Sequence, residues 1–151
     1  MNLSKNFTLA ELVFSPTAVQ LGIKNEPTPD QIHKLEALCK NVLQPLRDYF
    51  GKPIVISSGF RSRELNKAVG GASDSQHMRG EAADIRIIGT GNDILWKYIE
   101  SNLRYDQVIL EHVSACNPHT GWVHVSCALV NRKQALSIPR KGVTLQGMHY
   151  A

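Results

Sequence analysis

The chain has 151 residues, of which 42% are hydrophobic, so it is long enough for one domain, spanning 1–151, with a core that needs no disulfides. Its 17 Lys and Arg against 13 Asp and Glu give a net charge of +4 without a long basic run. Such mild basicity excludes no polyanionic partner, whether cell wall, nucleic acid or acidic membrane. The three cysteines, Cys39, Cys116 and Cys127, are odd in number and lack Cys-x-x-Cys spacing, which argues against a disulfide framework and favours reduced, buried thiols.

The distribution of apolar residues argues against a membrane protein. Nowhere do about 18 apolar residues follow one another, and the first residues contain no apolar run of signal-peptide length. We therefore expect a protein that is made in the cytoplasm and does not insert into a membrane. If its substrate lies outside the membrane, another factor must give it access.

Two capping signatures predict helices in the first third of the chain. Thr8 with Glu11 forms a capping-box pattern for a short helix that Ser15-Pro16 ends. Thr28 with Pro29 and Gln31 repeats the signature at the start of a longer helix. Apolar residues then recur at steps of three and four, at Ile32, Leu35, Leu38, Cys39, Val42, Leu43 and Leu46. This helix is core scaffold, and we expect Pro45 to bend its last turns.

The remainder of the chain alternates between strand and helix patterns. Strands are predicted at 54–58, 82–88, 107–111 and 122–127, and helices at 63–69 and 92–103. A loop with two glycines lies at 70–74. We expect the tail after residue 139 to be irregular, because it contains Gly142, Gly147 and scattered polar residues.

A histidine and a carboxylate seven positions apart are the leading candidates for metal binding. His77 and Asp84 are separated by glycine and small residues, so a turn can bring both to one ion. Zinc takes nitrogen from imidazole and oxygen from carboxylate, and a catalytic zinc has three protein ligands with an open fourth position. His124 supplies a third candidate from a predicted strand, on the face shared with Trp122 and Ser126. From the residues alone, ordinary hydrogen-bonded histidines remain an alternative.

The other histidines lack a patterned carboxylate partner. We expect solvent-facing or structural roles for most of His33, His112, His119 and His149.

Several motifs together resemble peptidase family M15, which includes zinc D-alanyl-D-alanine carboxypeptidases and phage endolysin L-alanyl-D-glutamate peptidases. The resemblance runs from Phe7 to about Ser126 and is carried by Ser58-Gly59-Phe60-Arg61-Ser62, Asn66, Gly70-Gly71, Ser75-x-His77-x-x-Gly80-x-Ala82-x-Asp84 and Trp122-x-His124-x-Ser126. Two further stretches, Phe7 to Leu12 and Val42 to Arg47, resemble a phage-borne and prophage-borne branch of the family.

The resemblance implies an α+β fold in which a small antiparallel sheet, packed with helices, carries one Zn²⁺ ion. It implies that His77, Asp84 and His124 hold the metal and that Arg61 binds the substrate carboxylate or carbonyl near it. A guanidinium suits that role because it stays charged and forms paired hydrogen bonds. Ser75 is a candidate for hydrogen bonding to the substrate or the ligand loop, and a turn-forming role is equally consistent with its position.

The general base departs from the family pattern. Many members place an acidic residue three positions before the last histidine, where this chain has Gly121. The nearest alternative is Glu111, at the end of a strand expected to pair beside the His124 strand. A carboxylate that faces water at a strand end would look the same in sequence, and Asp106 or His112 could substitute for it.

These residues predict a zinc-dependent peptidase of the phage endolysin type, which cuts peptide bonds in the stem peptides of bacterial peptidoglycan during lysis or from within a virion. A D-Ala-D-Ala carboxypeptidase is the alternative within the enzyme class, and a non-catalytic zinc-bearing virion module is the alternative outside it. We expect a monomer. The basic charge and the arginines at 61, 63, 79 and 86 do not make a nucleic-acid-binding motif, so no nucleic acid partner is expected.

Overall fold

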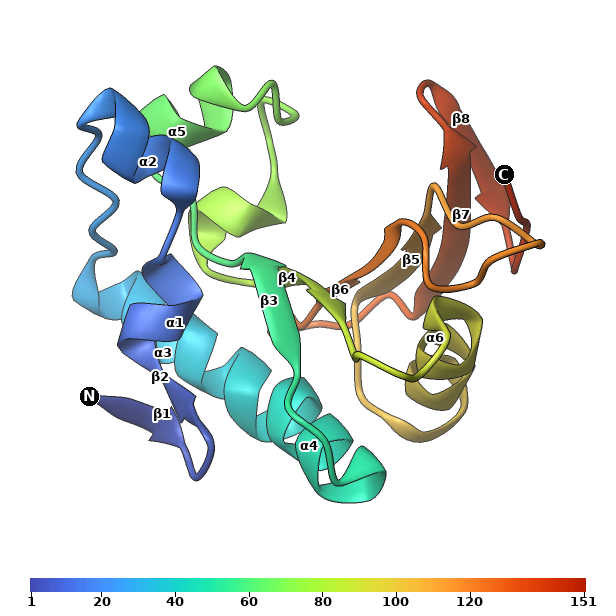
Figure 1. Cartoon of the computed structure of the whole chain (residues 1–151). Helices are drawn as coiled ribbons and strands as arrows, with labels where there is room; N and C mark the ends of the chain where they lie inside the picture. Colours follow the sequence, from blue (N-terminus) through green and yellow to red (C-terminus); the bar gives the residue numbers. More distant parts are fainter.

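The computed structural model describes all 151 residues and consists of helices packed around one main sheet (Figure 1). Its α-helices are α1 (Leu9–Val13), α2 (Pro16–Leu21), α3 (Pro29–Leu38), α4 (Gln44–Phe50), α5 (Arg63–Ala68) and α6 (Asn92–Asn102). Its strands are β1 (Asn2–Ser4), β2 (Phe7–Thr8), β3 (Val55–Ser58), β4 (Ala82–Arg86), β5 (Gln107–Glu111), β6 (Trp122–Ser126), β7 (Gln134–Arg140) and β8 (Val143–Gln146). The α+β class predicted from the sequence is confirmed.

The main sheet is larger than predicted. It has six strands in the order β3-β4-β6-β5-β7-β8, whereas β1 and β2 form a separate ribbon. Every neighbouring pair is antiparallel except β5 and β7, which run parallel. The expectation of a small antiparallel sheet is therefore wrong in both size and strand direction.

The difference comes from two strands: β7, where no strand was predicted between residues 128 and 139, and β8, which lies in the tail that was expected to be irregular after residue 139. Instead, β7 extends to Arg140 and β8 folds back on it as a hairpin. Pro139 is compatible with this strand because it lies where the β7–β8 register shifts between Ser137 and Arg140, outside the regular ladder. Gly142 supports the tight turn with a positive φ of 80°.

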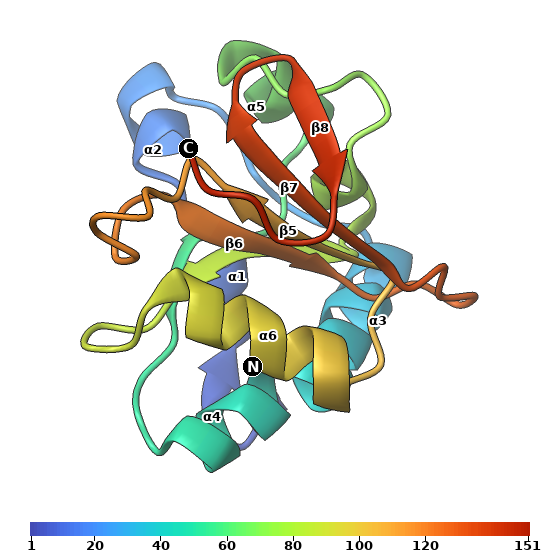
Figure 2. The same cartoon turned by 90° about the vertical axis from the view of Figure 1, so that its right-hand side faces the viewer.

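The two faces of the sheet differ as the two-residue period of strands requires. Val108, Leu110, Val123 and Val125 point to one face and are almost fully buried in a core cluster of 23 residues. Helix α6 covers β5 and β6 (Figure 2), and its Leu95 and Ile99 belong to the same core. The opposite face of these strands is thereby left for polar side chains.

The predicted capping boxes are confirmed at Thr8 with Glu11 and at Thr28 with Gln31, and Ser15 also caps a second short helix, α2, that the sequence had not indicated. The predicted bend near Pro45 takes the form of a π-helical segment, Cys39–Leu43, between α3 and α4. Proline has no N–H to donate and its ring crowds the preceding turn, which accounts for a wider turn at this position.

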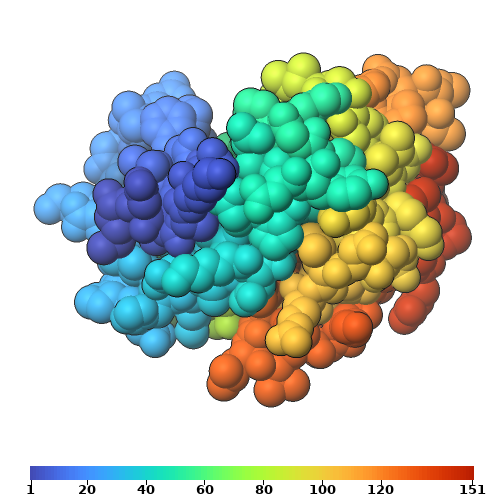
Figure 3. Space-filling model, turned by 90° about the horizontal axis from the view of Figure 1, so that it is seen from below, coloured from blue at the N-terminus to red at the C-terminus, as the bar shows by residue number.

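The helical region and the sheet region are joined by a continuous core. Figure 3 shows the α4 segment beside the α6 segment on one face of the molecule. The rings of Tyr49 in α4 and Tyr98 in α6 stack with centroids 3.9 Å apart. Buried residues from Leu3 to Cys127 belong to the same core cluster. The core therefore packs against the apolar face of the strands that carry polar residues on their other face.

Two smaller expectations concern the cysteines and the membrane. Cys39 and Cys127 are buried and unpaired, but Cys116 is exposed, because it lies in the polar loop between β5 and β6. Burial raises the pKa of the Cys39 thiol to about 12. No helix of the chain combines the length and the apolar character needed to cross a bilayer.

Candidate metal centre

Strand register brings two of the predicted ligands together. In the β4–β6 pairing Asp84 lies directly opposite His124, and Ser58 of β3 pairs with Asp84 from the other side. Residues that face each other across strands have Cβ atoms about 4.5–5.5 Å apart, which is the reach of two ligands of one ion. Asp84 and His124 thus come together on the polar face of the sheet.

His77 reaches the same place from a short 3-10 helix, Gln76–Arg79, that precedes β4. Ser75 caps this helix, since its hydroxyl accepts a hydrogen bond from the His77 backbone N–H at 3.2 Å. Gly80 ends it with φ at +76°, and a Cβ there would lie 2.6 Å from the Gln31 carbonyl oxygen. The turn between His77 and Asp84 therefore depends on glycine, as the sequence had indicated.

The three side chains form one compact group. One ligand atom from each of His77, Asp84 and His124 lies within 4.8 Å of the others. Asp84 Oδ1 is 3.3 Å from His77 Nε2 and 3.1 Å from His124 Nδ1. Two imidazoles and a carboxylate make up a donor set that zinc uses in catalytic sites.

The hydrogen bonds around the group suit a metal. His77 Nδ1 lies 2.7 Å from the Gly59 carbonyl oxygen, which can only accept, so Nδ1 carries the proton and Nε2 presents a lone pair toward Asp84. Burial lowers the pKa of His77 and favours its neutral form. Burial alone would raise the pKa of Asp84, but the adjacent imidazoles of His124 and His77 outweigh burial and lower that pKa. Neutral imidazole and ionised carboxylate are the forms that bind metal.

Arg61 lies beside the group with its guanidinium held in place. Its Nε donates to the Ser58 hydroxyl at 2.9 Å, Nη1 donates to Asn66 Oδ1 at 3.3 Å, and Nη2 donates to Asp84 Oδ2 at 3.4 Å. The side chain is only 15% exposed. The structure thus places this arginine where the sequence predicted it, next to the candidate metal ligands.

Glu111 lies on the same polar face as His124. It pairs with Trp122 across β5 and β6, and its Oε2 accepts a hydrogen bond from Trp122 Nε1 at 3.0 Å. Burial and the nearby charge of Asp84 raise the pKa of Glu111. A half-buried carboxylate with a raised pKa beside a candidate metal group has the properties of a general base.

The two substitutes for Glu111 are occupied or misplaced. Asp106 is 1% exposed, and both of its oxygens accept hydrogen bonds from Arg132, which together with Gln76 lower the pKa of Asp106 to about 2. His112 is exposed, has a positive φ of 56° and stacks on Trp122, and it does not line the cleft described below. Of the three residues, Glu111 is therefore the best placed to act as the general base.

The geometry at Gly121 explains why no acidic side chain stands there. Gly121 has φ at +67°, and a Cβ built on it would lie 2.1 Å from the Glu111 carbonyl oxygen and 2.6 Å from that of His112. Any side chain would force the β5 and β6 ends apart. The chain thus excludes an acidic residue at the usual family position and has one at Glu111, across the same strand pair.

We expect Gly121→Ala to lower the free energy of unfolding by about 1–3 kcal/mol from the left-handed backbone alone, and by more because of the close carbonyls. Gly142→Ala is the matched control, because Gly142 has φ at +80° but no atom within 4 Å of its Cβ position. Urea titration of both variants measures the difference. Equal losses in the two variants would show that the contact with Glu111 and His112 costs nothing.

The group opens into a cleft of about 530 Å³. Its lining includes the predicted residues Arg61, Ser75, His77, Asp84, Glu111, Trp122 and His124. It also includes Gln76, Arg79, Gln107 and Arg132, which had not been identified from the sequence. Gln76 lies inside a quoted motif, and the alternation of β5 that places Glu111 on the polar face also places Gln107 there. Arg132 lies beyond the last motif, so no sequence signal indicates it.

Comparison with known proteins agrees with this geometry. The sequence model of the peptidase M15 family matches residues 5–126. Zinc D-Ala-D-Ala carboxypeptidase of Streptomyces albus G is 54% identical over 44 residues, which make up 28% of this chain and only 17% of that relative. The match to the family covers most of the chain and contains all three candidate ligands. The chain therefore belongs to the peptidase M15 family, and His77, Asp84 and His124 form a group able to bind a metal ion.

Proposed function

We propose that this protein hydrolyses peptide bonds in the stem peptides of bacterial peptidoglycan, as a zinc endopeptidase of the phage endolysin type. In this proposal it acts as a monomer and reaches the wall through another factor or as part of a virion. A D-Ala-D-Ala carboxypeptidase is the alternative, and the name of the Streptomyces relative favours it.

The observation that carries the proposal is the composition of the cleft. Three candidate metal ligands lie together at its floor, with a fixed arginine on one side and a carboxylate of raised pKa nearby. A purely structural zinc is normally closed by four protein ligands, whereas a catalytic zinc has three and an open position. A group of three in an open cleft supports catalysis over a structural zinc module.

Each residue has a role that follows from its contacts. A zinc ion held by His77, Asp84 and His124 supplies a Lewis acid and a water of lowered pKa. Arg61 directs a guanidinium toward the carboxylate or carbonyl of the bound peptide. Glu111 has Oε2 engaged by Trp122, so Oε1 is the atom that takes a proton from the attacking water and passes it to the leaving amine.

Arg61→Lys is expected to retain zinc and fold but to lose most activity on wall peptide. Lysine keeps the charge but cannot form the paired hydrogen bonds of a guanidinium, nor hold Ser58 and Asn66 at once. Turnover of a stem peptide, measured alongside zinc content, provides the test. Arg63→Lys is the matched control on the exposed start of α5. Unchanged turnover in Arg61→Lys would remove this arginine from the site.

Mass spectrometry of muropeptides released from several wall types, with and without a chelator, tests the proposed function. Cleavage inside the stem peptide indicates an endopeptidase, and release of single terminal D-alanine indicates a carboxypeptidase. Products that vanish with the chelator and return with zinc support a zinc peptidase. Absence of any product from every wall would instead favour the non-catalytic module.

A further inference from the structure

A second arginine of the cleft has no place in the proposed chemistry. Arg132 lies in the loop between β6 and β7 and lines the same cleft as Arg61. Its Nε contacts both oxygens of Asp106, at 3.0 and 3.2 Å, and its Nη2 donates to Oδ2 at 2.6 Å. Its backbone N–H donates to Asp106 Oδ1 at 2.8 Å. Asp106 thus fixes both the backbone and the guanidinium of Arg132.

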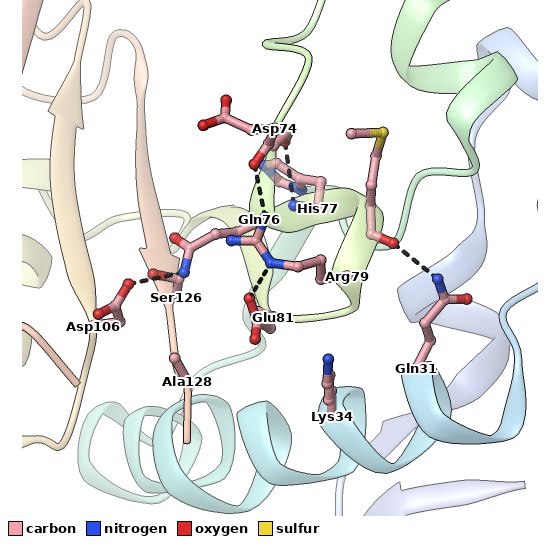
Figure 4. Close-up of polar contacts among 12 residues, drawn as sticks. Gln31, Lys34, Asp74, Gln76, His77, Arg79, Glu81, Asp106, Ser126 and Ala128 are labelled. Atoms are coloured by element: carbon pink, nitrogen blue, oxygen red, sulfur yellow. Dashed lines mark hydrogen bonds and ion pairs between the residues drawn. The ribbon is translucent and has the colours of Figure 1, made fainter. Parts of the chain in front are cut away.

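The support beneath Arg132 is buried. Asp106 is 1% exposed, and Gln76, which is 8% exposed, donates from Nε2 to Asp106 Oδ2 at 2.8 Å (Figure 4). The other end of that amide, Oε1, has no hydrogen-bond partner although it is buried.

The Arg132 side chain itself is half exposed, at 50%. Its Nη1 forms none of the hydrogen bonds that fix the other nitrogens. A guanidinium held along one edge presents its remaining N–H groups in a fixed direction, which lowers the entropy lost on binding an anion. Arg79 also lines the cleft, but its Nε is engaged by Glu81 and its Nη1 by the Asp74 carbonyl (Figure 4).

We propose that Arg132, oriented by Asp106 and Gln76, is a second carboxylate-binding point of the cleft, so that the preferred substrate is a peptide with a free carboxylate away from the bond that is cut. The proposal rests on the proposed peptidase function and specifies its substrate class. Arg61 binds the carboxylate or carbonyl near the metal, and Arg132 binds the carboxylate of an acidic residue farther along the peptide. A peptide whose carboxylate is amidated should bind more weakly.

Binding rather than turnover gives the clearest test. The zinc-loaded Glu111→Gln protein is titrated calorimetrically with L-Ala-γ-D-Glu-L-Lys-D-Ala and with the same peptide carrying D-isoglutamine in place of D-glutamate. We expect the acidic peptide to bind about 10-fold or more tightly than the amide, the usual worth of a hydrogen bond to a charged group. Adding Arg132→Gln should bring this ratio close to one, and Arg132→Lys should retain part of it.

The controls separate recognition from loop anchoring. Lys133→Gln removes the same charge from the next residue, which does not line the cleft, and should leave the ratio unchanged. If Arg132 merely anchors its loop, Arg132→Gln will weaken both peptides equally and the ratio will persist, which overturns the proposal. Equal binding of both peptides before Arg132 is changed overturns it too, while leaving the peptidase function intact. If neither peptide binds, the proposed function itself fails with these substrates.

Discussion

Glu111→Gln is expected to lower kcat by about 10²–10⁴-fold, the usual contribution of general acid–base catalysis, with little change in KM. The amide has the shape of the carboxylate and its oxygen still accepts from Trp122 Nε1, but the NH2 group that replaces Oε1 cannot take a proton. Zinc content and thermal stability should stay close to those of the unmodified protein. Single-turnover hydrolysis of a stem peptide measures the chemical step directly.

Glu26→Gln is the matched control, because Glu26 is exposed and lies outside the cleft. Wild-type turnover in Glu111→Gln would show that another group is the base. Since Asp106 has a pKa of about 2 and is engaged by Arg132, the search would then turn to a water-mediated relay rather than to that carboxylate. Loss of zinc in Glu111→Gln would instead make Glu111 a ligand or a support of one.

His77→Ala, Asp84→Ala and His124→Ala are each expected to abolish tight zinc binding. Loss of an outer-shell partner of a metal site already costs about 10–100-fold in affinity, and loss of one of only three ligands should cost more. Zinc content after dialysis and competition with a chromophoric chelator measure the affinity. His33→Ala is the control, because the His33 side chain is 78% exposed and lies outside the cleft.

If one of the three variants keeps one equivalent of zinc at native affinity, the residue that it replaces is not a zinc ligand. Asp84 needs a second variant, because its carboxylate also accepts from Arg61 and its loss could disturb the fold. Asp84→Asn keeps that shape and removes the charge. It should remain folded and still bind zinc far more weakly than the unmodified protein.

The metal group could be predicted from sequence because it depends on local patterns. His77 and Asp84 lie within one motif, and the turn between them needs glycine at a positive φ, which the sequence displays as Gly80. The alternation of a strand placed His124 on the face of Trp122, and the cleft contains both. The pairing of Asp84 with His124 is a register between distant strands, and only the family resemblance anticipated it.

What could not be predicted depends on contacts between distant segments. The β7 strand is held by parallel pairing with β5 and by the Trp96 Nε1 hydrogen bond to the Leu136 carbonyl oxygen, whereas Pro139 and Gly142 give it the local appearance of a loop. The contacts of Arg132 with Asp106 likewise join residues 26 positions apart. The close approach that excludes a side chain at Gly121 is equally invisible until the strands are paired.

Hydrolysis of a stem peptide as a function of added zinc is the most direct test of the account. The metal-free protein should be inactive, and activity should rise linearly to a plateau at one equivalent of zinc, with a new amine and a new carboxylate formed in equal amounts. The His124→Ala protein should show no such rise at the same zinc concentrations. Full hydrolysis by the metal-free protein, or a zinc response that His124→Ala leaves unchanged, would contradict a zinc peptidase centred on His77, Asp84 and His124.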